Sequence, residues 1–234
     1  MRVLLASSER GFRGGERQLT LLAAGLARRG AEVTVACAGG SPLASALAPL
    51  GIPVADVPMR GALDLAAAGR LRALGRRHDV VHAYTPNAHA LCALAAFGGG
   101  PPLVATRHLD LPLRDTLWNR AKYGACARIV CVSRAVRRAL TAGGVDAART
   151  VVIPCAIPAP ILPDRIAARQ DLGLAPDAVA VLNLAAWVEQ KDPLLLLDAW
   201  ATVVAAAPTA VLLMAGGGAL ESALRARAAT LDRV

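Results

Sequence analysis

The sequence predicts a doubly wound α/β fold, in which helices cover both faces of a parallel sheet. Short apolar runs alternate with helix-like stretches along the 234 residues. Continuous Val-, Leu- and Ala-rich runs of this kind are typical of strands buried on both faces. Apolar residues make up 55% of the chain, enough for a substantial core. Together these observations favour an α/β sheet over an all-helical or all-β fold.

The first 37 residues form the most informative unit. We expect a buried strand at 2–7, a loop with the paired glycines Gly14 and Gly15, an amphipathic helix ending at Gly30, and a strand at 32–37. Two parallel strands joined by a helix open a doubly wound sheet, whose ligands bind at the switch point. Glycines there allow close backbone approach, and a helix N-terminus favours an anion. A connection without a ligand is the alternative.

The same alternation continues along the chain. Further strands are expected at 52–57, 79–84, 102–107, 128–133 and 150–154, with helices at 62–77, 86–97, 113–126 and 134–142. Strands and helices that alternate on this scale indicate a parallel sheet.

A proline-rich segment divides the chain. Four prolines occur between Pro154 and Pro163, which indicates a linker. We therefore expect one domain at 1–163 and a second at 164–234. The second would contain helices at 164–172, 192–206 and 219–231 and strands at 179–185 and 209–215. Two parallel strands do not readily close a core, so we expect this domain to be incomplete and the chain to be cut short.

The charge is unevenly distributed. Residues 1–165 carry 21 Lys and Arg against 10 Asp and Glu. Such a balance suits phosphorylated ligands or an anionic membrane surface, although a general bias toward Arg also explains it. No nucleic-acid partner is expected, because aromatic residues make up only 3% of the chain and no nucleic-acid-binding motif is present.

We expect a cytoplasmic protein, because no apolar run approaches the ~18–20 residues of a membrane span and the first strand is too short for a signal peptide. Peripheral attachment to the inner face of the membrane is a further hypothesis. It rests on the helix at 62–77, where leucines and arginines alternate. The alternative is a helix that packs its leucines inward and solvates its arginines.

The cysteines form no metal or redox motif. They are Cys37, Cys92, Cys126, Cys131 and Cys155, and no C-x-x-C pair occurs. We interpret all five as unpaired structural thiols and expect no metal or cofactor.

Two histidines are candidate site residues. His82 and His108 lie near the ends of the fourth and fifth expected strands. In the usual strand order the fourth strand lies beside the first, and the fifth lies beside the fourth. The two histidines and the glycine loop would then share one rim of the sheet. Imidazole can hydrogen-bond sugar hydroxyls or, when protonated, face a phosphate. Packing at a strand end is the alternative, and zinc is disfavoured because no ligand spacing fits.

Lys191 is the third candidate. It precedes an expected helix and is one of only two lysines in the chain. A lysine beside a helix N-terminus can neutralise a phosphate. The alternative is a loop lysine that is merely solvated.

Neither G-x-G-x-x-G nor a Walker A motif is present, so a dehydrogenase or P-loop enzyme is not expected.

The chain resembles the GT-B glycosyltransferases, and specifically the retaining family 4. The resembling segments are, in order, Gly14–Leu19, Leu26–Val33, Asp79–Tyr84, Val104–His108, Ile129–Val136, Val152–Pro154, Glu189–Asp192 and Met214–Gly218. The resemblance implies two Rossmann-like domains, with the acceptor on the first and a nucleotide-diphosphate-sugar donor mainly on the second. It implies no metal, and a cell-envelope glycolipid or polysaccharide as acceptor.

The resemblance also implies roles for the candidate residues. Gly14 and Gly15 would approach the donor diphosphate, His108 would contact the transferred sugar or the acceptor, and Lys191 would stabilise the leaving diphosphate. Two departures stand out. Ala185-Ala186 occupies the place of the usual Gly-Arg pair, and the acidic donor-site segment would lie beyond Val234. The alternative to an active enzyme is therefore an inactive Rossmann-like binding module left by truncation.

Overall fold

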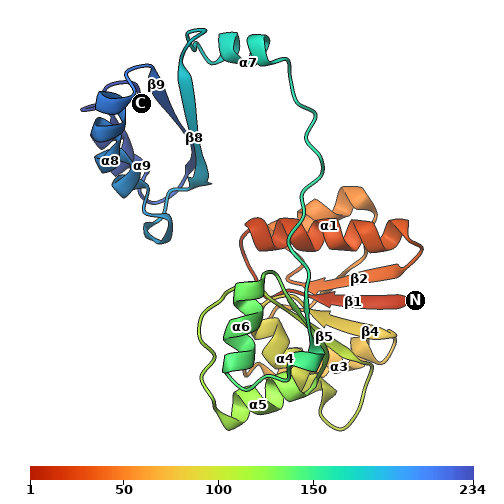
Figure 1. Ribbon diagram of the computed structural model, residues 1–234. Helices are drawn as coiled ribbons and strands as arrows, with labels where there is room; N and C mark the ends of the chain where they lie inside the picture. The colour runs from red at the N-terminus through yellow and green to blue at the C-terminus, as the bar shows by residue number, and fades with distance from the viewer. The chain divides into compact units, whose positions relative to one another are not determined.

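The computed structural model describes residues 1–234 and divides the chain into two compact units, Met1–Pro158 and Ala159–Val234. The first unit contains seven strands and the second contains two. Figure 1 shows the two units joined by an extended segment, which follows the strand β7 (Thr150–Val152).

One parallel sheet of seven strands forms the centre of the first unit, in the order β3-β2-β1-β4-β5-β6-β7. The strands are β1 (Arg2–Ala6), β2 (Glu32–Cys37), β3 (Val54–Asp56), β4 (Val80–Ala83), β5 (Leu103–Arg107), β6 (Cys126–Cys131) and β7 (Thr150–Val152). The chain moves outward from β1 to β3 and then returns to place β4 on the other side of β1. The boundary between β1 and β4 is therefore the topological switch point.

Helices cover both faces of this sheet, as Figure 1 shows. They are α1 (Gly14–Arg28), α2 (Pro42–Leu47), α3 (Leu65–Gly75), α4 (Pro86–Ala96), α5 (Leu117–Gly124) and α6 (Arg134–Ala142), with short 3-10 turns at Ala48–Leu50 and Ala147–Arg149. Successive side chains of a strand point to opposite faces. Leu5 accordingly packs in one core with Leu19 of α1, and Leu4 packs in another with Leu91 of α4. The predicted doubly wound architecture is confirmed.

Two local expectations differ from the structure. The helix α2 was not expected; the hydroxyl of Ser41 accepts the N–H of Ala44 at 3.3 Å and caps it, and Pro42 follows at the first helical position. The helix expected at 62–77 is shorter, and its leucines do not all lie on an exposed face. Leu71 is buried in the core against α4, and the Arg72 guanidinium donates to the carbonyls of Ala95 and Phe97.

The second unit contains α7 (Arg165–Asp171), β8 (Val179–Ala186), a 3-10 turn (Glu189–Lys191), α8 (Pro193–Ala206), β9 (Ala210–Gly217) and α9 (Glu221–Ala228). The two strands pair in parallel along their whole length. Trp187, Leu197 and Trp200 form the centre of a small core beneath them. On the other face, Leu182 and Leu184 are 62% and 76% exposed, so this sheet is covered on one side only.

Candidate functional site

A polar crevice of about 490 Å³ opens at the switch point of the first unit. It lies between the loop after β1, the start of α4 and the loop after β3. The loop after β1 is tied to the end of β4, because the backbone N–H of Ser8 donates to the Thr85 hydroxyl at 2.9 Å and the two hydroxyls lie 2.8 Å apart. The two segments that border the switch point are thus held together at the mouth of the crevice, where a doubly wound sheet binds its ligand.

Gly14 and Gly15 lie in the first turn of α1, not in the preceding loop as expected. A Cβ atom added at either position would meet nothing within 4 Å, so both face open space. The guanidinium of the preceding residue, Arg13, has no acceptor atom and cannot cap the helix amides. The first N–H groups of α1 therefore have no side-chain acceptor, and binding of an anion there remains a prediction.

Glu16 fixes the start of this helix. Its carboxylate accepts the backbone N–H of Arg13 at 2.9 Å, and the side chain is buried. This is half of a capping box, in which the third helical residue reaches back to the N-cap. Sequence reasoning missed Glu16, although the Gly-Gly-Glu sequence at a helix start is a usable signal.

His108 lies at the carboxyl edge beside this helix. Its ring packs against that of Tyr84 with 4.9 Å between centroids, and its Nε2 is buried without a hydrogen-bond partner. Burial lowers the pKa of His108 below its ordinary value, while the carboxylate of Glu16 acts in the opposite direction. The imidazole thus has one ring nitrogen without a hydrogen-bond partner in the chain.

His82 does not lie on the same rim. It sits within β4, opposite Leu5 and Val104, and its Nε2 shares a hydrogen bond with the Thr106 hydroxyl at 2.7 Å. Burial, with a smaller effect of His108, lowers the pKa of His82 to about 4. Tyr84, whose ring centroid is 5.8 Å from that of His82, occupies the rim position instead. The expected meeting of both histidines with the glycine turn is therefore wrong for His82.

His82 and Thr106 border a separate groove of about 640 Å³ between α1 and the strands β4 to β6. The segment after β7 closes one side of this groove. There the Gln18 side chain donates to the Ala156 carbonyl at 2.7 Å and accepts the Ala156 N–H at 3.0 Å. This paired hydrogen bond fixes the start of the proline-rich segment on α1.

Arg107 positions the loop that follows β5. Its guanidinium donates to the carbonyls of Leu109 at 2.8 Å and Leu111 at 3.0 Å, and to the Tyr123 hydroxyl at 3.4 Å. These bonds fix the backbone that follows His108 in the chain. No sequence signal distinguished Arg107 among the arginines of the chain.

Lys191 belongs to the second unit, where it ends the 3-10 turn Glu189–Lys191 and is exposed. Asp192 follows with a positive φ of 43°, and α8 begins at Pro193. The lysine therefore lies beside a helix N-terminus, as predicted. Lys191 belongs to the second unit and His108 to the first.

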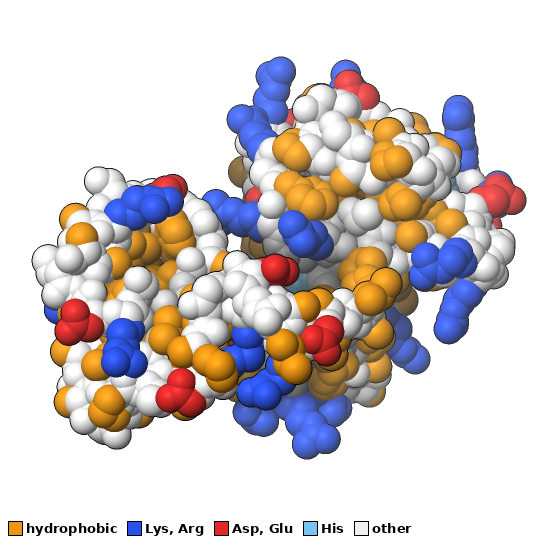
Figure 2. Space-filling view, turned by 90° about the horizontal axis from the view of Figure 1, so that it is seen from above, with side chains coloured by type: hydrophobic (Ala, Val, Ile, Leu, Met, Phe, Trp, Pro, Cys, Tyr) orange, Lys and Arg blue, Asp and Glu red, His pale blue; other side chains and the backbone are white.

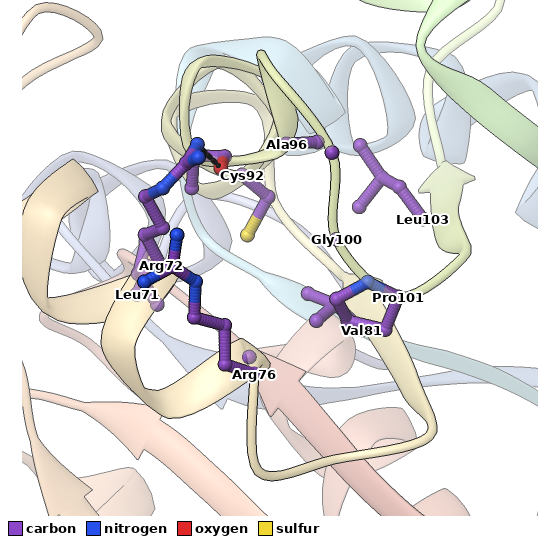
Figure 3. Close-up of a pocket in the computed structure, with 12 residues that line it drawn as sticks. Leu71, Arg72, Arg76, Val81, Cys92, Ala96, Gly100, Pro101 and Leu103 are labelled. Carbon is purple, nitrogen blue, oxygen red and sulfur yellow. Dashed lines mark hydrogen bonds between the residues drawn. The ribbon is translucent and has the colours of Figure 1, made fainter.

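A small cavity near the opposite edge of the sheet is not a candidate site (Figure 3). The Cys92 side chain points into it, and Val81, Pro101 and Leu103 close the other side. Its volume of about 20 Å³ admits little more than one water molecule. Burial raises the pKa of the Cys92 thiol to about 12, so this cysteine is an inert core residue.

All five cysteines are free thiols, and Cys155 alone is exposed. No group of three or more His, Cys, Asp and Glu side chains is arranged to hold a metal ion. No helix is both long and apolar enough to cross a membrane.

Comparison with known families now defines the class of protein. The model of Glycosyltransferase Family 4 matches residues 12–159, which include the glycine turn and His108. The chain belongs to glycosyltransferase family 4. Its sequence has no match among curated proteins.

Solved structures show the same fold. Anabaena Alr3699/HepE in complex with UDP superimposes with a TM-score of 0.80 at 20% identity, over 98% of this chain and 66% of the other. A glycosyltransferase from Rickettsia africae gives a TM-score of 0.70 at 14% identity, over 92% and 68%. The lipopolysaccharide outer core galactosyltransferase WaaB gives 0.63 at 12% identity, over 98% and 65%. The predicted GT-B glycosyltransferase fold is confirmed, and the chain spans about two thirds of the length of these structures.

Proposed function

We propose that the protein transfers a sugar, with retention of configuration, from a nucleotide-diphosphate donor to a cell-envelope glycolipid or polysaccharide. Membership of family 4 over residues 12–159 is the observation that carries this proposal. HepE structures that resemble the chain contain UDP and UDP-glucose, which favours a uridine nucleotide sugar as donor. WaaB, which acts in the lipopolysaccharide outer core, favours an envelope acceptor.

In this proposal the first unit holds the acceptor. The polar crevice receives the acceptor's reacting end, and the unpartnered Nε2 of His108 engages a hydroxyl of the transferred sugar or of the acceptor. Since the pKa of His108 is lowered by burial, its ring is neutral at pH 7 and acts by hydrogen bonding. Gly14 and Gly15 offer backbone N–H groups to the donor diphosphate at the start of α1.

Departure of a nucleoside diphosphate develops negative charge that a fixed cation must stabilise. Lys191 supplies this charge from the second unit. Ala185 and Ala186 leave no arginine beside it on β8, so the transfer depends on one lysine more strongly than it would on a Lys-Arg pair. No metal is proposed for this step.

The alternative is a non-catalytic binding module of the same fold. The exposed face of the two-stranded sheet favours it, because a donor site built on this sheet would be only partly formed. Reading the gene downstream of codon 234 separates the two. In-frame continuation into an acidic E-x7-E segment supports the enzyme, and an immediate stop codon followed by unrelated sequence supports the module.

Transfer itself is tested with labelled UDP-sugars and a membrane extract as acceptor, using protein expressed from its complete reading frame. Label that enters the lipid or polysaccharide fraction supports the proposal. Binding of UDP-sugars without any incorporation, across several donors and acceptors, contradicts it.

Peripheral attachment to an anionic membrane is proposed separately. Leu71 is buried and cannot contact lipid, whereas Leu63 and Leu65 are 76% and 74% exposed. Leu63 lines a shallow surface hollow with Arg60 and Arg70. Co-sedimentation with anionic vesicles, but not with neutral ones, supports this attachment. Equal binding to both vesicle types contradicts it.

A further inference from the structure

The crevice at the switch point combines arginines from two separate loops. Arg10 and Arg13 come from the loop after β1, and Arg60 comes from the loop after β3. Figure 2 shows Lys and Arg side chains spread over the visible surface of the first unit, so basic charge alone does not mark a site. What distinguishes these three is that they line one concave space.

None of the three guanidiniums is paired with a carboxylate. The ion pairs of the chain use Arg2, Arg120, Arg149, Arg225 and Arg227. An exposed arginine on a convex surface needs no partner, because water solvates it. Three unpaired arginines around one crevice instead create a positive potential that low-dielectric walls focus.

Nearby carboxylates offset only part of this charge. Glu16 accepts the Arg13 backbone N–H, and Asp64 accepts the N–H groups of Arg60 at 3.1 Å and Ala67 at 3.0 Å. Neither carboxylate forms an ion pair with an arginine side chain. Glu9 and Glu16 are the acidic residues that line the crevice, so its three arginines exceed them by one charge.

The helix that begins at the crevice adds to this potential. Asn87 lies in the first turn of α4, whose N-cap is Thr85. The Thr85 hydroxyl bonds Ser8 and does not cap the helix, so the first N–H groups of α4 have no side-chain acceptor. Helix N-termini stabilise anions.

We propose that Arg10, Arg13 and Arg60 bind a phosphate or diphosphate group of the acceptor. This inference rests on the proposed function, in which the donor diphosphate is served by Lys191 and the start of α1. It deepens that function, because a phosphate-bearing, lipid-linked acceptor differs chemically from a neutral polysaccharide end. Planar guanidinium groups bind phosphate oxygens in pairs, which gives orientation as well as affinity.

The test uses the 234-residue chain and inorganic pyrophosphate as the probe, measured by isothermal titration at low salt. Binding at one site is expected. The variants Arg10→Gln and Arg60→Gln should each raise Kd roughly tenfold, the loss typical of one charge-assisted contact. Arg138→Gln is the matched control, because Arg138 is exposed on α6 away from the crevice. Unchanged circular dichroism of each variant shows that the fold is intact.

A second arm separates acceptor from donor. Pyrophosphate binding that persists in saturating UDP, and still depends on Arg10 and Arg60, supports an acceptor subsite. Competition by UDP through the same two arginines overturns it, since the crevice would then hold donor phosphates. No saturable binding, or an equal loss with Arg138→Gln, also overturns it.

These outcomes are distinct from those of the proposed function. If the chain binds pyrophosphate through Arg10 and Arg60 but the protein has no transferase activity, the phosphate site is supported and the proposed function is contradicted. If the protein transfers sugar to neutral acceptors and neither Arg10→Gln nor Arg60→Gln changes this activity, the proposed function is supported and the phosphate site is contradicted.

Discussion

The rings of Tyr84 and His108 lie 4.9 Å apart between centroids, tilted by 59°. Tyr84 comes from the segment after β4 and His108 from the segment after β5, so the contact joins two neighbouring loops at the carboxyl edge. Tyr84 is buried, whereas His108 is only half-buried. The buried Tyr84 ring thus packs against the His108 ring and restricts its position.

Tyr84→Ala should destabilise the first unit by about 3–5 kcal/mol, the usual cost of removing a buried aromatic ring. It should also raise the pKa of His108 toward its ordinary value, because burial is what lowers it. Tyr84→Phe keeps the ring and should leave both quantities nearly unchanged. Urea unfolding and NMR titration of His108 measure the two effects. An unchanged His108 pKa in Tyr84→Ala would show that the ring contact does not set it.

Glu16→Ala should lower the free energy of unfolding by about 0.5–2 kcal/mol, because the Arg13 N–H loses its acceptor at the start of α1. Glu16→Gln keeps an acceptor oxygen but not the charge, so it should lose about half as much. Urea titrations of both variants at pH 7 provide the comparison. Equal losses in the two variants would indicate that packing, and not the hydrogen bond, explains the effect.

Gly216→Ala should destabilise the second unit, since a Cβ at Gly216 would lie 1.9 Å from the Ala185 carbonyl oxygen. Overpacking of this kind typically costs about 1–3 kcal/mol. Gly217→Ala is the control, because a Cβ there meets nothing within 4 Å. Tryptophan fluorescence follows this unit, which contains Trp187 and Trp200 in its core. Similar unfolding midpoints for the two variants would contradict the close strand packing.

The stability of the first unit should fall as the pH is lowered from 6.5 toward 4. The pKa of His82 falls from 6.5 to about 4 on folding, and that of buried His89 falls to about 3. The unfolded chain therefore binds more protons in this range, so acidification favours it, by up to ~1.4 kcal/mol per pH unit for each histidine. The lowered pKa values of Asp64 and Asp79 act at lower pH, since both start from 3.8.

His82→Gln isolates one part of this dependence. It should flatten the fall in unfolding free energy between about pH 6 and pH 5, since glutamine does not titrate there. Urea unfolding at several pH values gives the slope. A slope as steep as that of the unaltered chain would mean that His82 is not buried in its neutral form.

Much of the fold follows from local sequence, because most strands of the first unit contain a short apolar run and most helices have a recognisable start or end. Strand order followed from the rules of doubly wound sheets. Helix α2 was missed since six residues show too little periodicity. Local sequence also could not show on which face of β4 His82 lies, because a one-residue shift in strand register reverses the face.

The candidate site was only partly predictable for a related reason. His108 and the paired glycines could be proposed as site residues from the sequence because they stand at the ends of recognisable elements. The arginines of the crevice were not, because Arg10 and Arg60 lie in loops whose paths depend on tertiary contacts such as the bond between Ser8 and Thr85. Arginine is also frequent throughout the chain, so Arg10 and Arg60 did not stand out in the sequence.

His108 and Lys191 are the residues proposed to serve sugar transfer. The most direct test measures turnover of UDP-sugar by protein expressed from its complete reading frame, with His108→Ala and Lys191→Ala beside the controls His78→Ala and Gln190→Ala. Losing one charge-assisted contact costs roughly 2–4 kcal/mol in the transition state, so Lys191→Ala should lower kcat about a hundredfold, with a smaller but clear loss in His108→Ala. Both should melt at the temperature of the unaltered protein, and both controls should retain full activity. Rates near those of the unaltered protein in His108→Ala and Lys191→Ala would contradict this account.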